Sequence, residues 1–231
     1  MPLGADLVDA VHRARLRRLE SRGEPTMRAK ARWLQASPGP GLTWGRALDG
    51  GDFVAKADRH GAFGSDRVLL EIGPGYGRIL RSCLQSDAPF GRYIGLDLSA
   101  ENVDRLRDAF ADPRVEFVNG DVETADLDVE VDTVLSSLTF KHLYPSFEPA
   151  LANVARQLSD RGLVLFDLIE GKRRCFEPDE ITYIREYSRQ EVEETLDRAG
   201  LQVLSFDEVV HDHDHRRLLV VASASGESPS K

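Results

Sequence analysis

The sequence predicts an α/β fold: a doubly wound, seven-stranded sheet that is mostly parallel, carries helices on both faces and ends in a C-terminal antiparallel hairpin. Three observations predict it. Short apolar runs alternate with segments of helical periodicity. A turn with three glycines, at 73–77, follows the first of these runs. The last two runs, 203–210 and 218–222, have no helix between them, so the final strand must return antiparallel.

The N-terminal residues, 1 to about 35, are predicted to form an extension with one or two amphipathic helices. Eight basic side chains lie between Val11 and Trp33, against only Glu20 and Glu24. A solvated helix face is favoured over a site for RNA or an anionic substrate, because basic runs are unspecific. The apolar stripe that would dock this helix consists of Leu7, Val8, Val11, Ala14 and Leu19.

A loop separates this extension from the rest of the chain. Residues 37–41, SPGPG, contain two prolines and two glycines and cannot continue a helix. Residues 44–60 are predicted to be a connecting and helical stretch that packs beside the first strand.

The segment from Val68 to Arg78 reads VLLEIGPGYGR, which predicts a strand, a sharp turn and the start of a helix. Gly73, Gly75 and Gly77 supply unusual φ angles and allow a ligand to touch the main chain. The free N–H groups of the helix N-terminus would face that ligand. The third glycine comes one residue earlier than in G-x-G-x-x-G, so the segment departs from the NAD fingerprint.

Acidic residues follow the next two predicted strands. Residues 93–98, YIGLDL, close on Asp97, whose carboxylate can accept both ribose hydroxyls, roughly 20 residues beyond the glycines. Residues 115–118 close on Asn119-Gly120-Asp121-Val122, where the Asp121 carboxylate and the next N–H could read an adenine edge. Three successive strand ends are therefore expected to converge on one nucleoside.

The downstream elements continue the alternation of strands and helices. Residues 163–169 are almost continuously apolar, as expected for a strand that is buried on both faces. Ser188 and Glu191 predict a capping box at the start of a helix that ends at Gly200.

In order and spacing, these motifs resemble those of class I S-adenosylmethionine-dependent methyltransferases of the small-molecule type. EIGPGYG resembles that family's first motif, GLDLS the ribose-binding segment and NGDVE the adenine segment. Residues 131–143, VDTVLSSLTFKHL, resemble the segment that lines the methyl-donor end. The resemblance covers about residues 53–223, and Ser159-Asp160-Arg161-Gly162 stands where such enzymes often carry a Pro-Gly-Gly turn.

The resemblance implies S-adenosylmethionine as cofactor and S-adenosylhomocysteine as product. Glu71 is expected to orient the methionine ammonium, together with the backbone around Ser136 and Ser137. Its alternative role is to cap the following helix N-terminus. The residues expected to bind the cofactor are Glu71, Gly73, Gly75, Tyr76, Gly77, Asp97, Leu98, Asn119, Gly120, Asp121, Val122, Ser136 and Ser137.

The expected reaction is in-line methyl transfer to an oxygen or nitrogen atom of a small-molecule acceptor, which depends mainly on alignment. His142 is the candidate general base, and its near-neutral pKa would suit that role. The alternative is a histidine that hydrogen-bonds a loop or the cofactor's carboxylate. Tyr144 either shapes the acceptor pocket or packs. The acceptor pocket is expected to come from a lid, from 139–147, from 172–187 and from the last hairpin.

Three parts of the chain are expected: a helical extension and lid at 1–52, the Rossmann-like S-adenosylmethionine-binding domain at 53–223, and a disordered tail at 224–231. Segments before the first strand often close over the ligand in the resembling family. Trp44 and Phe53 are the candidates for that lid, with a place in the core as the alternative.

The net charge of −9 argues against a protein that coats nucleic acid. Lys172, Arg173 and Arg174 point to an anionic small-molecule acceptor, or else to a solvated loop. Two alternative functions stay open: methylation of RNA or protein through the basic extension, and binding of the cofactor without catalysis. Against the first, SSLTF follows the fourth strand in place of the N/D-P-P-Y type segment of amino-methylating nucleic-acid enzymes.

Neither a metal site nor a membrane partner is expected. His211, His213 and His215 alternate and would share one face of an extended segment, but polar hairpin turns are common. The two cysteines fit neither a disulfide framework nor a zinc site. The chain has no 18-residue apolar run, so a cytoplasmic location is expected, and the oligomeric state, a homodimer included, stays open.

Overall fold

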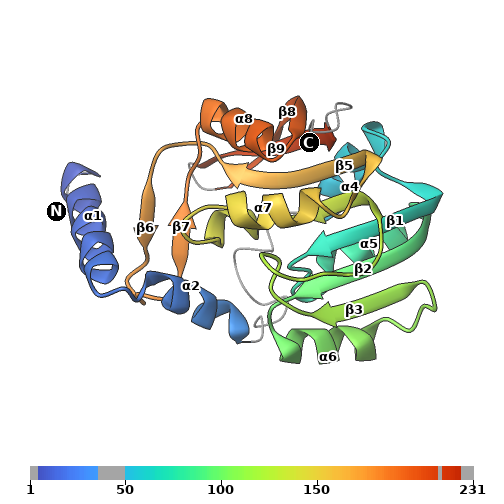
Figure 1. Cartoon of the computed structure of the whole chain (residues 1–231), viewed down its shortest axis with the longest axis horizontal. Coiled ribbons are helices and arrows are strands. Elements are labelled where there is room, and N and C mark those ends of the chain that lie inside the picture. The colour runs from blue at the N-terminus through green and yellow to red at the C-terminus, as the bar shows by residue number, and fades with distance from the viewer. Residues whose placement is uncertain (1–4, 36–49, 213–214, 225–231) are drawn as a thin grey trace.

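A seven-stranded sheet in the order β3-β2-β1-β4-β5-β9-β8 forms the centre of the protein (Figure 1). The computed structural model describes residues 5–35, 50–212 and 215–224. β9 alone runs antiparallel, between β5 and β8, which confirms the predicted fold class. The strands are β1 (Gly64–Ile72), β2 (Phe90–Asp97), β3 (Val115–Asn119), β4 (Val131–Ser136), β5 (Leu158–Ile169), β8 (Leu201–Asp212) and β9 (His215–Ala224).

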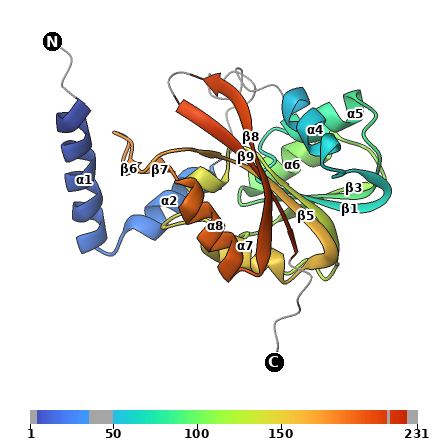
Figure 2. The same cartoon turned by 90° about the horizontal axis from the view of Figure 1, so that it is seen from above.

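Helices cover both faces of this sheet, and their apolar stripes build its core (Figure 2). α4 (Gly50–Arg59), α5 (Arg78–Gln85) and α6 (Ala100–Ala109) pack on one face, where Phe53, Ile79 and Leu80 are buried. α7 (Glu148–Ala155) and α8 (Arg189–Arg198) pack on the other, through Leu151 and Leu196. The layers are those of a doubly wound sheet.

The caps of α8 follow the sequence prediction. The Ser188 hydroxyl accepts a hydrogen bond from the Glu191 N–H at 3.3 Å, which satisfies one of the free donors of the first helical turn. At the other end Gly200 adopts φ +74°, so the chain leaves the helix through a left-handed residue.

A small cap, of which the sequence predicted the N-terminal helices but not the hairpin, stands beside the sheet. α1 (Ala5–Ser21) and α2 (Pro25–Leu34) pack against a two-stranded hairpin of β6 (Arg174–Phe176) and β7 (Tyr183–Arg185), and we call these four elements the cap. They share a hydrophobic cluster of their own, in which Leu16 and Leu19 contact Phe176. Figure 2 shows α1 as an arm, with the hairpin between it and the sheet.

The apolar stripe predicted for α1 is partly wrong. Leu19 is buried as expected, but Val11 is 48% exposed and Ala14 is also exposed, while Leu16 provides the second buried contact. The side chains of Leu7 and Val8 lie outside the described residues. The docking face turned out different because the partner is a short hairpin, which is long enough to cover only the C-terminal half of the helix.

Several expectations concern the ends of the fold and its linker. Phe53 lies in the core with 3% exposure, so its alternative role holds and it is no lid residue. The expected boundary between 52 and 53 falls in the first turn of α4, and the division into domains stays a prediction. Trp44, the 37–41 loop and most of the expected tail lie outside the described residues. Within the described ranges, no helix is both long and apolar enough to cross a bilayer.

Two leucines one turn apart on α5 test the buried face of this helix. Leu80 is fully buried, whereas Leu84 is 36% exposed. We expect Leu80→Ala to lower the free energy of unfolding by about 2–5 kcal/mol, because it removes buried methyl groups and leaves a cavity. The matched Leu84→Ala should cost less than about 1 kcal/mol. Urea unfolding measures both, and equal losses would contradict the assigned face.

Candidate functional site

A cavity of about 360 Å³ lies where the carboxyl ends of β1 to β4 meet the cap. Loops after these four strands form its floor, and α2 with the loop between β6 and β7 closes it from the other side. Ligands of open α/β sheets bind at this edge, where the strand order reverses. Here the reversal falls between β1 and β4, directly below the cavity.

The glycine turn after β1 brings main chain to the cavity wall. Gly73 adopts φ +68°, and a Cβ built on it would collide with the Thr139 side chain. Gly77 is the N-cap of α5 with φ +80°, and a Cβ there would collide with the Phe110 ring. Both positions therefore need glycine for two reasons, the left-handed backbone and the close neighbour.

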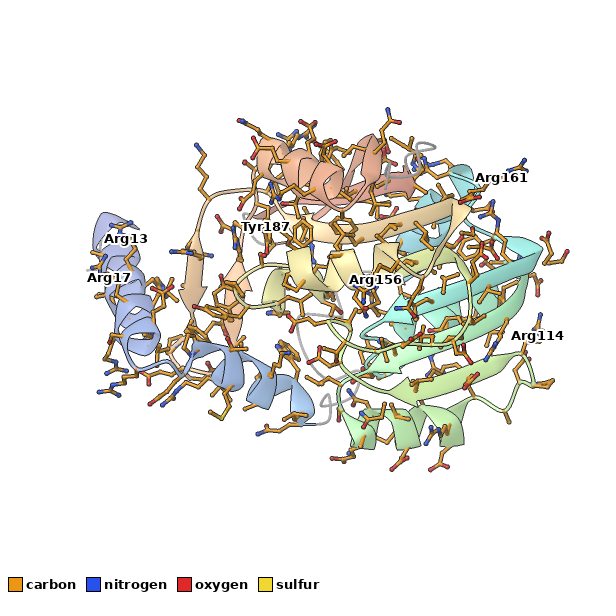
Figure 3. The ribbon with its side chains drawn as sticks, viewed as in Figure 1. Arg13, Arg17, Arg114, Arg156, Arg161 and Tyr187 are labelled. Atoms are coloured by element: carbon orange, nitrogen blue, oxygen red, sulfur yellow. The ribbon has the colours of Figure 1, made fainter. Side chains whose placement is uncertain are left out.

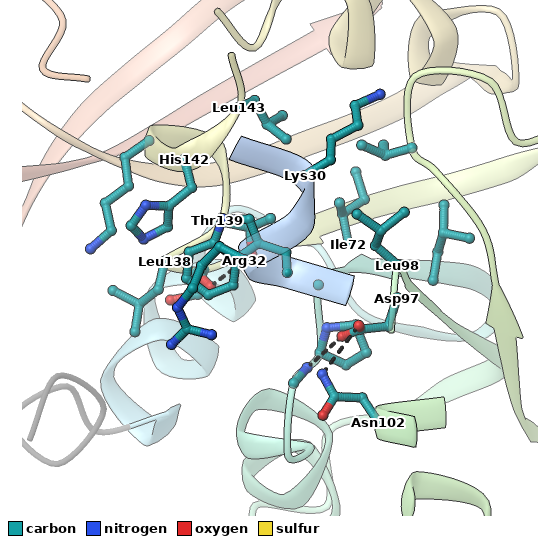
Figure 4. Close-up of a pocket in the computed structure, with 18 of the residues that line it drawn as sticks. Lys30, Arg32, Ile72, Asp97, Leu98, Asn102, Leu138, Thr139, His142 and Leu143 are labelled. Atoms are coloured by element: carbon teal, nitrogen blue, oxygen red, sulfur yellow. Dashed lines mark hydrogen bonds between the residues drawn. The ribbon is translucent and has the colours of Figure 1, made fainter. Parts of the chain in front are cut away.

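Asp97 ties this turn to the end of β2. Its Oδ2 accepts the Gly75 N–H at 3.1 Å, and its Oδ1 accepts the N–H of Ser99 at 2.9 Å and the Asn102 amide at 3.2 Å (Figure 4). The carboxyl group is 6% exposed, and burial raises its pKa although these donors act in the opposite direction. Asp97 thus presents a fixed, largely desolvated acceptor at the cavity wall.

Asp121, after β3, is held by the cap. The Lys30 ammonium from α2 lies 2.5 Å from Asp121 Oδ2 and 2.6 Å from Glu123 Oε2. Burial lowers the pKa of Lys30, but the two carboxylates raise it further than burial lowers it. All three groups are partly exposed, so the contact is an ion pair at the rim of the cavity that closes α2 over it.

Glu71 lies at the end of β1, 2% exposed, and accepts a hydrogen bond from the Tyr93 hydroxyl. Burial raises its pKa to about 7, while the Tyr93 hydrogen bond and the nearby Arg78 act in the opposite direction. A carboxyl group in this state carries a proton through part of the physiological range. Its charge therefore responds to a cationic group placed beside it in the cavity.

A second buried carboxylate, Asp167 on β5, fixes the loop after β4. It accepts hydrogen bonds from the Ser137 hydroxyl at 2.5 Å and the Leu138 N–H at 3.0 Å, and pairs with Arg217 at 2.7 Å. Burial raises the pKa of Asp167, but Arg217 and the two donors hold it below its usual value. This anchor keeps Leu138 at φ +68°, a conformation that L residues rarely adopt.

His142 follows in the 3₁₀ turn η1 (Phe140–His142) and is 6% exposed. Its Nδ1 lies 2.7 Å from the Tyr183 carbonyl oxygen, so Nδ1 carries the proton of the neutral ring and Nε2 is the basic nitrogen. Its ring packs on Trp33 of α2, with 4.5 Å between centroids. Burial and the neighbouring Lys141 hold its pKa well below the near-neutral value that the sequence suggested.

Most of the predicted site residues line this one cavity. They are Glu71, Gly73, Gly75, Tyr76, Asp97, Leu98, Gly120, Asp121, Val122, Ser137 and His142. Gly77, Asn119 and Ser136 lie behind it and hold its backbone: the Asn119 amide bonds the carbonyls of Asp97 and Leu98 at 3.0 Å, and the Ser136 hydroxyl that of Ile72 at 3.2 Å.

The cap contributes residues that sequence reasoning missed. Lys30, Arg32 and Trp33 reach the cavity from α2, where the sequence placed only a solvated face. The segments 139–147 and 172–187 were expected to line a pocket, and each contributes residues to the cavity wall. They are Thr139, Lys141, His142, Leu143 and Tyr144 from the first, and Glu177, Asp179 and Thr182 from the second. The role of α2 could not be read from its basic composition, because the pairing of Lys30 with two acids far along the chain produces no periodic pattern in the sequence.

Among the described residues, cysteines and histidines outside this cavity form neither a disulfide nor a metal site. Cys83 and Cys175 are both buried and free. No group of three His, Cys, Asp or Glu side chains in the described part of the chain could hold a metal ion. The side chains of His211, His213 and His215 lie outside that part.

Comparison with known proteins points to one family. Residues 70–166 match the family model described as a methyltransferase domain. The chain is 26% identical over 151 residues to the malonyl-[acyl-carrier protein] O-methyltransferase of Anoxybacillus flavithermus, covering 65% of this chain and 56% of that protein. It is 33% identical over 114 residues to the fatty-acid O-methyltransferase of Mycolicibacterium smegmatis, covering 49% of this chain and 39% of that protein.

A solved structure shares the fold. The glycopeptide N-methyltransferase MtfA in complex with S-adenosyl-L-methionine superposes with a TM-score of 0.60 at 19% identity, over 76% of this chain and 94% of that one. At this identity the likeness concerns the fold alone. The chain spans only about half the length of the curated relatives it matches.

Glu71 should make stability depend on pH in a way that Glu71→Gln removes. The folded-state pKa of about 7 exceeds the usual 4.5, so the unfolded chain releases this proton first as pH rises. The stability gained from the protonated form is complete below pH 4.5 and is lost between there and pH 7, by up to ~3 kcal/mol. Urea unfolding across this range should show that loss in the parent and a flatter curve in the variant. Parallel curves would contradict the shifted pKa.

Proposed function

Since residues 70–166 form a domain of the class I S-adenosylmethionine-dependent methyltransferase family, we propose that the protein transfers a methyl group from S-adenosylmethionine to an oxygen or nitrogen atom of a small-molecule acceptor. S-adenosylhomocysteine is then the product. One observation carries this proposal: the glycine turn and the acids Glu71, Asp97 and Asp121, which come from three separate strand ends, line one cavity.

The residues present fit this cofactor. The cavity lies in the usual volume range of small-molecule sites. At Gly73 a Cβ would collide with Thr139, which also lines the cavity, so the glycine lets the turn approach the cavity wall closely. Asp97 offers desolvated oxygens in a fixed orientation, which suits a ribose diol, and Asp121 suits the exocyclic amine of adenine.

When bound, S-adenosylmethionine supplies an electrophilic methyl group on a sulfonium centre. The protein's own contribution is to bind, align and exclude water, and alignment of this kind lowers a barrier by up to ~7–11 kcal/mol. We assign the methionine end to Glu71 and the Ser137 loop. The loop is rigid because Asp167 holds it, and Glu71 gains charge beside an ammonium because its pKa lies near neutrality.

His142 is the proposed general base for an acceptor that must lose a proton. The hydrogen bond from Nδ1–H to the Tyr183 carbonyl orients Nε2, and burial keeps the ring neutral at physiological pH by lowering its pKa. A base with so low a pKa is weak. A carboxylate acceptor, which needs no proton removed, would not require this base, whereas an aliphatic hydroxyl would need a stronger one.

The relatives support oxygen as the acceptor atom over nitrogen, because the two curated proteins compared above are both named as O-methyltransferases. The alternatives, an RNA or protein acceptor and a binding module without catalysis, have less support. The basic extension that motivated the first is partly occupied with closing the cavity through Lys30.

Calorimetric titration tests the proposal directly. We expect S-adenosylmethionine and S-adenosylhomocysteine to bind the purified protein in the micromolar range, which corresponds to about −8 kcal/mol. Absence of binding by either compound would reject the function. Incubation with labelled donor and a metabolite extract, followed by mass identification of the labelled product, then separates an enzyme from a binding module.

Two glycines with similar backbone angles provide a matched pair of variants. Gly73 and Gly61 adopt φ +68° and +72°, but a Cβ at Gly73 would collide with Thr139, whereas nothing lies within 4 Å of one at Gly61. Gly73→Ala should weaken S-adenosylhomocysteine binding by roughly tenfold or more, because the turn must move from the cavity wall. Gly61→Ala should bind normally, and equal losses in the two variants would remove the turn from the site.

A further inference from the structure

A second hollow, of about 600 Å³, lies on the cap between α1 and the start of β6. It is separate from the proposed cofactor cavity and shares no lining residue with it. The side chains that line it come from one face of α1 and from the chain around β6. They are His12, Arg13, Leu16, Arg17, Glu20, Lys172, Arg173, Arg174 and Glu186.

The hollow is strongly basic although the whole chain carries a net charge of −9. Five of its side chains are permanently positive and two are carboxylates. Arg173 pairs with Glu186 at 3.2 Å, and Arg174 lies 4.0 Å from Glu20. Arg13, Arg17 and Lys172 are exposed, and none has a carboxylate within ion-pair distance among the described residues. Figure 3 shows Arg13 and Arg17 on α1, at the end of the molecule farthest from Arg161.

One buried group in the hollow has an unused hydrogen-bonding position. Nδ1 of His12 is inaccessible to water and has no hydrogen-bond partner among the described residues. Arginine guanidinium groups on facing elements are the usual means of gripping a phosphate through paired hydrogen bonds.

The hollow lies beside the Tyr144 end of the cofactor cavity, to which no cofactor contact is assigned above. The Tyr144 hydroxyl, which lines that cavity, bonds Oε1 of Glu20, which lines the hollow, at 3.4 Å. Glu177 lies on the cavity side of the same wall. Burial and Asp179 raise its pKa, and His12 and Arg173 of the hollow act in the opposite direction. The Tyr144–Glu20 contact therefore lies between the two spaces.

We propose that this hollow binds a phosphate group of the acceptor, whose methyl-accepting atom lies beyond Tyr144 in the cavity. The proposal rests on the methyl-transfer function above and specifies its acceptor. A phosphate is favoured over a single carboxylate because the excess of positive charge exceeds what one negative charge balances, whereas a phosphate monoester carries about −1.5 to −2 at pH 7.

Inorganic pyrophosphate is the probe for the hollow itself. Calorimetry on the full chain should detect binding that weakens with salt, and Arg13→Ala/Arg17→Ala/Lys172→Ala should weaken it by roughly tenfold or more. The control with an equal change of charge is Arg59→Ala/Arg105→Ala/Arg161→Ala, at exposed arginines on the sheet domain, and it should bind within about twofold of the parent. No binding, or equal losses in the two triple variants, would overturn the site. So would binding of an RNA oligonucleotide but not of pyrophosphate, since that outcome assigns the charge to nucleic acid.

Methyl transfer distinguishes a phosphate on the acceptor from free phosphate. An extract treated with alkaline phosphatase, and then freed of the enzyme and of inorganic phosphate, should lose the labelled product that the untreated extract gives. The hollow variant should lower that product while binding S-adenosylhomocysteine normally. A product that survives the treatment and is formed equally well by the variant would overturn the assignment. If neither cofactor form binds, the proposed function fails, while the pyrophosphate titration still decides the hollow.

Discussion

The three hydrogen bonds that Asp97 accepts hold the site together. They join the glycine turn after β1, the end of β2 and the first turn of α6 through one carboxylate. Two of the donors are backbone N–H groups, of Gly75 in the turn and of Ser99 before α6, and the third is the side-chain amide of Asn102, so Asp97 satisfies the turn while holding it at the cavity wall. These bonds fix the orientation of a carboxylate that also lines the cavity. The parallel strands bring the ends of β1 and β2 to one edge of the sheet, and Asp97 then fixes the positions of the glycine turn and α6 relative to each other.

The sheet and the floor of the cavity could be predicted because both follow from short-range rules. Apolar runs mark buried strands, and parallel strands place their carboxyl ends at one rim, so Glu71, Asp97 and Asp121 had to come together. The missing helix between the last two runs required the antiparallel pair. Composition could not predict the protonation state of these acids. Glu71 contacts Tyr93 on the adjacent strand, and this contact depends on the register of the two strands.

The hairpin of the cap, and the way the N-terminal helices pack on it, escaped prediction for a physical reason. β6 and β7 have three residues each, too few for a period-two pattern to stand out, and Arg174 and Arg185 flank their buried positions with charge. The face that α1 buries depends on what this hairpin covers, which explains why Leu16 replaced the expected Val11. Lys30 and Trp33 gained their roles only once α2 lay over the sheet edge. The cap side of the cavity thus depends on long-range packing, whereas the side formed by the strand loops follows from local sequence.

The cap joins two segments that lie far apart in the sequence, and this has a consequence for assembly during synthesis. Arg15 on α1 bonds the carbonyl oxygen of Phe176, 161 residues later, and Leu16 and Leu19 have their cluster partners in the same hairpin. During synthesis α1 and α2 therefore wait until β1 to β5 and the hairpin have been made, since their apolar side chains have no earlier partner in that cluster. A chain interrupted before β7 would leave the cavity without this part of its cover.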